Sequence, residues 1–182
     1  MLRWCIGLAV VAVLTGCATS IPPSAVADPL ARSYAGRLAV RVEGDDARSF
    51  TAGFDLQGTD TRGQLALISP IGTQVGRAVW QPGQVRWQSA DGERQFDNLD
   101  ALAEEMLGEA VPLAALFDWM AGRPWAGLPS RPLSTAEGDP AQTGFRQLGW
   151  DVQTGRVADG VIVAQRRLPA PTLTVRIKLD PP

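Results

Sequence analysis

The residue types that usually carry catalysis are scarce in this sequence. None of its 182 residues is histidine, which excludes Ser-His-Asp and Cys-His nucleophilic sites and the histidine-ligated zinc sites of many hydrolases. The spacing of its glycines and cysteines excludes dinucleotide-binding, P-loop, CxxC and nucleophile-elbow motifs. Carboxylates remain, but the adjacent Glu104 and Glu105 would point about 100° apart on a helix. With Asp118 they form no convergent pair, so we expect no enzyme activity, no cofactor and no metal site.

One cysteine has the surroundings of a modification site. Residues 1–3 give a short positive start, residues 4–13 are apolar but too few to span a bilayer, and Leu14-Thr15-Gly16-Cys17 follows. This order resembles a bacterial lipoprotein signal peptide with its lipobox. The resemblance implies that residues 1–16 are removed, that the Cys17 thiol carries diacylglycerol and that the new amine is acylated. An ordinary signal peptide or a buried N-terminal helix is the alternative.

A lipid anchor would fix both the location and the layout of the chain. Each buried methylene contributes roughly 0.8 kcal/mol to membrane binding, so two or three acyl chains would hold the protein on a membrane. Ala18 follows Cys17, whereas an aspartate there resembles the inner-membrane retention signal of enteric bacteria. We therefore expect the outer membrane, facing the periplasm. Residues 17–33 are then a lipidated tether that reaches roughly 50 Å when extended, and residues 34–182 form one domain.

Apolar residues at every second position predict half-buried strands over most of this domain. The clearest example runs through Leu38, Val40 and Val42. Eight or nine short strands are expected, around residues 37–43, 50–56, 64–69, 77–81, 84–89, 145–154, 160–167 and 172–179.

The apolar period changes to that of a helix between Asp97 and Gly122. A first helix is expected after Asp97 as its cap, with Leu99, Leu102 and Met106 on its apolar face. A second follows Pro112, with an apolar face of Leu113, Leu116, Phe117 and Met120. The chain is thus predicted to be mainly β with a helical insert, an α+β fold built on a curved antiparallel sheet.

Charge is distributed unevenly along the chain. The 17 basic and 19 acidic residues give no global basic field, so we expect no nucleic-acid binding. Residues 91–118 hold eight acids against Arg94, a net charge of −7, and residues 156–178 hold five basic residues against Asp159, a net +4. These charges are either ordinary solvated surface, or the basic segment meets anionic lipid or an acidic partner.

A family resemblance covers nearly the whole mature chain. It is carried by a leucine-rich strand that runs into Ser69-Pro70-Ile71-Gly72, by a helix that starts at Pro112-Leu113 and ends in Trp119-x-x-Gly122-x-Pro124, and by Gly149-Trp150. The chain resembles the LolB family of outer-membrane lipoproteins. The resemblance implies an incomplete barrel with helices as a lid over an apolar cavity, as in the periplasmic carrier LolA. It also implies that lipidated proteins pass from LolA to this chain and then into the outer membrane.

The resemblance suggests two kinds of site residue. Ile71 takes the place of a protruding leucine implicated in membrane insertion of cargo. Aromatic and aliphatic residues on strand faces and lid helices either fill a core or line the cavity, since alternation does not tell which strand face is concave. The cavity candidates are Leu38, Val40, Phe54, Leu67, Val85, Trp87, Leu116, Phe117, Met120 and Trp150.

Two features depart from the enteric pattern of the family. The second strand has Phe54-Asp55-Leu56 in place of Phe-x-Trp, and no tryptophan closes the last strand. These departures bear on the shape of the cavity and not on its existence. We expect a monomer whose partners are a LolA-type carrier with its cargo and outer-membrane lipid. The alternatives are a structural envelope lipoprotein with a filled core, or another periplasmic lipid-binding lipoprotein.

Overall fold

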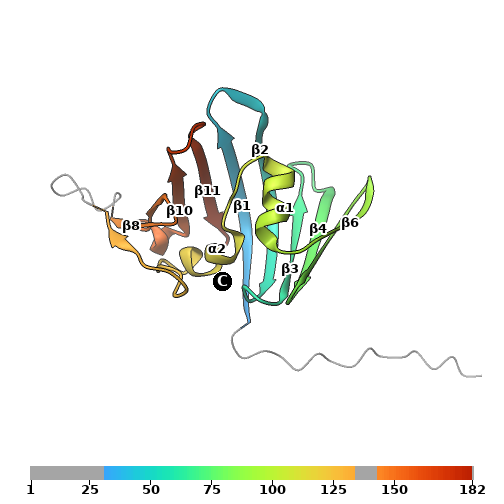
Figure 1. Cartoon of the computed structure of the whole chain (residues 1–182), viewed down its shortest axis with the longest axis horizontal. Coiled ribbons are helices and arrows are strands. Elements are labelled where there is room, and N and C mark those ends of the chain that lie inside the picture. Colours follow the sequence, from blue (N-terminus) through green and yellow to red (C-terminus); the bar gives the residue numbers. More distant parts are fainter. Residues whose placement is uncertain (1–30, 134–142, 182) are drawn as a thin grey trace, which may run out of the picture.

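The computed structural model describes residues 31–133 and 143–181. Its body is a single antiparallel sheet of eleven strands, in the order β6-β5-β4-β3-β2-β1-β11-β10-β9-β8-β7, with two helices across its concave face (Figure 1). The sheet curves but does not close, because β6 and β7 remain its two edges. The predicted fold class, an incomplete antiparallel barrel with a helical insert, is confirmed. No helix in the described ranges is long and apolar enough to cross a bilayer.

The strands follow the expected period of two. Their bounds are β1 Arg32–Val42, β2 Asp45–Gly58, β3 Gly63–Ile68, β4 Gln74–Gln81, β5 Gln84–Ser89, β6 Gly92–Phe96, β7 Arg131–Pro132, β8 Gly144–Gln147, β9 Trp150–Gln153, β10 Val161–Arg166 and β11 Leu173–Leu179. A short 3-10 helix, Val157–Asp159, precedes β10. Because β1 begins at Arg32, the sheet takes in the last two residues of the stretch assigned to the tether.

One predicted strand is wrong. Residues 145–154 form a hairpin of β8 and β9, joined by Leu148 and Gly149. Both turn residues have positive φ, 53° and 79°, as a two-residue turn matched to the strand twist requires. Leucine seldom adopts this conformation, so nothing at Leu148 marked a turn. Strands β6 and β7 were also not expected, because β6 is exposed at every residue except the half-buried Phe96 and β7 has only two residues.

The two predicted helices are present, with one change at a cap. They are α1 Leu99–Leu107 and α2 Leu113–Met120. The N-cap of α1 is Asn98 and not Asp97, since the Asn98 side chain accepts a 2.8 Å hydrogen bond from the Ala101 N–H. Gly108, at φ 64°, ends this helix with its N–H bonded to the Glu104 carbonyl. Pro112 starts α2, as expected.

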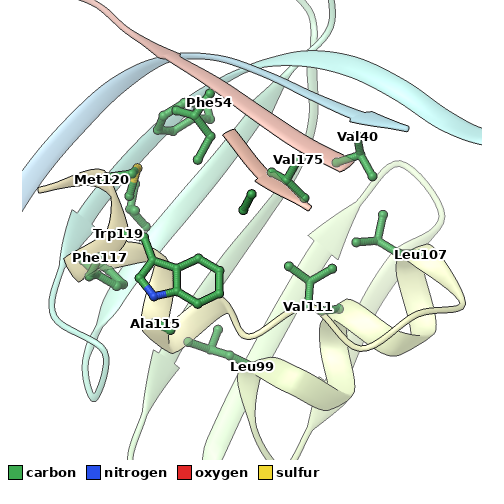
Figure 2. Close-up of a cluster of buried hydrophobic side chains, with 14 of the residues drawn as sticks. Val40, Phe54, Leu99, Leu107, Val111, Ala115, Phe117, Trp119, Met120 and Val175 are labelled. Carbon is green, nitrogen blue, oxygen red and sulfur yellow. The ribbon is translucent and has the colours of Figure 1, made fainter. Parts of the chain in front are cut away.

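The core lies between the helices and the concave face of the sheet. Figure 2 shows side chains of α1, α2 and the linker between them pointing toward strand residues such as Val40, Phe54 and Val175. Trp119 of α2 is fully buried, and its indole N–H donates a 2.9 Å hydrogen bond to the buried Gln147 amide of β8. The same amide bonds the backbone of Trp125 and Leu128. Helix α2 and the loop after it are thereby fixed to the sheet.

Candidate functional site

An apolar cavity of about 80 Å³ lies between the sheet and the helices. Its walls come from β1, β2, β3, β5 and β11 on one side and from α1, α2 and their linker on the other. All of the lining side chains are apolar: Leu38, Val40, Phe50, Leu65, Leu67, Trp87, Leu102, Ala103, Met106, Leu107, Val111, Leu113, Leu116, Val175 and Ile177. Such a surface holds hydrocarbon and offers no polar group to orient a reaction.

Half of the ten candidate residues border this cavity. They are Leu38, Val40, Leu67, Trp87 and Leu116. The other five are buried in the surrounding core: Phe54, Val85, Phe117, Met120 and Trp150. Phe117, for example, packs its ring edge-on against Trp80 with centroids 6.0 Å apart.

Sequence reasoning missed the walls contributed by α1 and β11. The α1 lining includes Ala103 and Leu107, one position away from the expected spacing, although Leu102 and Met106 on the expected face also line the cavity. Val175 and Ile177 of β11 lie opposite Val40 and Leu38 of β1. Their alternation was visible in the sequence, but the pairing that places them on the concave face was not.

A glycine shapes the wall at Trp87. A Cβ atom added to Gly76 of β4 would lie 2.0 Å from the Trp87 ring on the neighbouring strand β5. The missing side chain therefore lets the indole lie close over β4.

The linker between the helices is held to the sheet by charged groups. The Glu109 carboxylate accepts from Arg48 of β2 at 3.4 Å and from the buried Arg166 of β10. Arg166 also donates to the Ala110 carbonyl at 3.4 Å and lies over the Trp150 ring, 5.8 Å from its centroid. Its Nε has no hydrogen-bond partner in the described structure. Arg48 in addition bonds Asp45, which lowers the pKa of that carboxyl.

Ile71 lies at the tip of the turn between β3 and β4. The Gly72 N–H donates a 2.9 Å hydrogen bond to the Ser69 carbonyl, which closes a tight turn with Pro70 second and Gly72 fourth. The Ile71 side chain is 89% exposed. Ile71 therefore does not pack into the core, while its role at the membrane stays a prediction.

Two of the three candidate acids, Glu105 and Asp118, form ion pairs. Glu105 accepts from Arg94 at 2.6 Å, and Asp118 accepts from Arg32 at 3.1 Å and Arg123 at 2.6 Å. The bond to Asp118 raises the pKa of Arg32. A polar hollow of about 380 Å³ beside Asp118 is larger than the apolar cavity but is lined by Arg32, Asp60 and threonines. No group of three potential metal ligands occurs in the described ranges, and Cys17 lies outside them.

Comparison with known proteins shows to which family this β-rich chain belongs. The family described as "Outer membrane lipoprotein LolB" matches residues 31–180. The chain belongs to the LolB family of outer-membrane lipoproteins.

The sequence similarity to individual LolB proteins extends over most of this chain and most of each relative. The outer-membrane lipoprotein LolB of Bordetella petrii is 36% identical over 94% of this chain and 88% of its own. That of Chromobacterium violaceum is 31% identical over 87% and 86%, and that of Cupriavidus necator is 30% identical over 93% and 90%. The predicted resemblance is confirmed. As a LolB-type protein, the chain is an outer-membrane lipoprotein that takes part in the localisation of lipoproteins.

Proposed function

We propose that this LolB-family protein receives lipidated proteins from a LolA-type periplasmic carrier and inserts them into the outer membrane without catalysis. The observation that carries the proposal is the cavity between the helices and the sheet, which is lined only by apolar side chains. Acyl chains of the cargo would occupy it during transfer.

The cavity in this structure is too small for a long acyl chain. Pockets for small ligands commonly measure about 300–1,000 Å³, well above the 80 Å³ found here. An acyl chain would therefore enter only when the helices move away from the sheet. Since α2 is fixed through Trp119 and Gln147, the movement falls to α1 and the linker at Glu109.

The energetics suit a passive step. Exposing one long acyl chain to water costs roughly 10 kcal/mol, so cargo needs an apolar site at every stage. Cavity and bilayer interior are both apolar, and transfer between them requires no covalent chemistry or nucleotide. In this proposal Cys17 anchors the protein at the periplasmic face, one copy suffices for transfer, and Ile71 contacts the bilayer during release.

Titration with a fluorescent fatty acid tests the cavity. The protein used carries Cys17→Ala and is exported by a cleavable secretory signal, so that it has no lipid anchor. We expect saturable binding that Leu116→Glu weakens at least tenfold, because a carboxylate in an apolar wall is costly to desolvate. The matched control is Leu128→Glu, whose side chain is 45% exposed and lies outside the cavity. An absence of saturable binding would favour a structural envelope lipoprotein, and equal binding by both variants would exclude this cavity as the site.

A further inference from the structure

Acidic side chains gather on the helices that cover the concave face of the sheet. The acidic stretch of residues 91–118 forms β6 and the two helices, with Asp100, Glu104 and Glu105 exposed on α1. Figure 1 shows these helices across the concave face of the sheet. The opposite, outer face is the one on which basic side chains gather.

Four basic residues meet on the outer face of the two central strands. Pairing of β1 with β11 sets Arg37 directly opposite Lys178 and Ala39 opposite Arg176, and Arg41 lies two residues further along β1, opposite Thr174. All four cations are exposed, and they alternate with residues such as Val40 and Val175 that face the core. We call Arg37, Arg41, Arg176 and Lys178 the outer basic patch.

Within the described ranges, the four cations of the patch form no ion pair with a carboxylate, although Lys178 donates a hydrogen bond to the Asp159 carbonyl. The other cations of the basic segment are paired: Arg156 with Asp159, Arg166 with Glu109 and Arg167 with Asp151. Like charges placed directly opposite each other on a sheet, as in the pair Arg37 and Lys178, destabilise it. The arrangement is thus unfavourable for folding alone.

The patch also borders a hollow that suits an anionic group. A depression of about 550 Å³ over β1, β2 and β11 is lined by Arg41, Thr51, Thr174 and Arg176, among others. Guanidinium groups beside threonine hydroxyls are typical partners of phosphate oxygens. The surface that an outer-membrane lipoprotein meets permanently is a layer of phospholipid headgroups, which carry such phosphates.

We propose that the outer basic patch rests on the anionic phospholipid surface of the membrane. In this orientation the acidic face with α1 and α2 points away from the bilayer, so the charge separation and the lipid surface are complementary. The inference uses the outer-membrane location of the family and does not depend on acyl transfer.

Vesicle binding by the secreted full-length Cys17→Ala chain tests the patch apart from the lipid anchor. The probes are phosphatidylcholine vesicles with and without phosphatidylglycerol, over a range of salt. We expect a preference for phosphatidylglycerol that salt weakens and that falls about fivefold for each patch cation removed. A variant with Arg37→Gln, Arg41→Gln, Arg176→Gln and Lys178→Gln should lose the preference altogether.

A second variant with the same change in net charge is the control. Arg62→Gln, Arg94→Gln, Arg123→Gln and Arg131→Gln remove four cations that lie off β1 and β11, and this variant should keep the preference. Equal losses in both variants, or no preference in the unsubstituted chain, would overturn the inference. If the fourfold patch variant does not fold, Arg176→Gln alone must still show the fivefold loss. Fatty-acid binding is unaffected in either outcome, so failure here is distinguishable from failure of the proposed function.

Discussion

At the scale of single residues, Ile71 offers the sharpest separation of folding from function. Its side chain is 89% exposed, so Ile71→Glu removes almost no packing. Burial of such a side chain in a bilayer contributes about 1.5–3 kcal/mol, enough to assist release of an acyl chain but not to hold the protein on a membrane. We expect Ile71→Glu to retain cargo uptake and to stall release into liposomes, whereas Ile71→Leu releases normally.

Urea titration checks the structural side of this prediction. The unfolding midpoints of the Glu and Leu variants should stay near that of the unsubstituted chain. A midpoint drop that corresponds to several kcal/mol, without a separate defect in release, would show that Ile71 supports the fold.

Individual residues also show what the sequence could not settle. Ser69, Pro70 and Gly72 predict the Ile71 turn because each type has a positional preference in tight turns. No comparable preference assigns a side chain to a cavity. Leu67 lines the cavity while Phe54, directly opposite it in the β2–β3 pairing, lies in the core. The distinction depends on how the helices pack over the sheet, which is a tertiary property.

At the scale of elements, the linker between α1 and α2 is held to the sheet in part by Glu109, which a single substitution can test. Glu109 accepts from Arg48 and from the buried Arg166, and hydrogen bonds to charged groups contribute about 1.5–3 kcal/mol. We expect Glu109→Gln to lower the free energy of unfolding by that amount and to speed dissociation of a bound fluorescent fatty acid. Urea titration and stopped-flow displacement measure the two effects.

Glu105→Gln is the matched control for this linker. Glu105 accepts from Arg94 near the surface, with half of its side chain exposed, and such pairs contribute about 0–1 kcal/mol. Indistinguishable dissociation rates for the two variants would show that the linker does not limit movement of the helices.

Some helices and strands could be predicted from the sequence and others could not. Both helices and the central strands were predictable because one of their faces is buried, which imposes a period of 3.6 or 2. The outer element β6 was not, because its side chains are mostly exposed and no period results. The β8–β9 hairpin was missed for a different reason. The twist of the sheet requires a positive φ at Leu148, and leucine is not a residue type that predicts a turn.

At the scale of the whole molecule, the anchor and the domain should be separable. Every residue that lines the apolar cavity lies in β1 (Arg32–Val42) or after it in the chain. The secreted Cys17→Ala chain is therefore expected to accept cargo from a LolA-type carrier in solution, with delivery no longer restricted to the outer membrane. Transfer of a labelled lipoprotein in solution, followed by fractionation of cells that express the variant, measures both effects. A folded variant that accepts no cargo would contradict the separation.

The two free edges of the open sheet matter when many copies of the protein are concentrated on a membrane. An unclosed sheet presents backbone N–H and C=O groups along its edge strands, and these can recruit strands of neighbouring molecules into aggregates. Proteins confined to a membrane meet one another often, so the danger is greater than in dilute solution. Here the edge strand β6 carries Glu93 and Arg94, and β7 is only two residues long and ends in Pro132, which has no N–H to donate. The charges on β6 and the proline in β7 disfavour pairing of either edge with the sheet of a neighbouring copy.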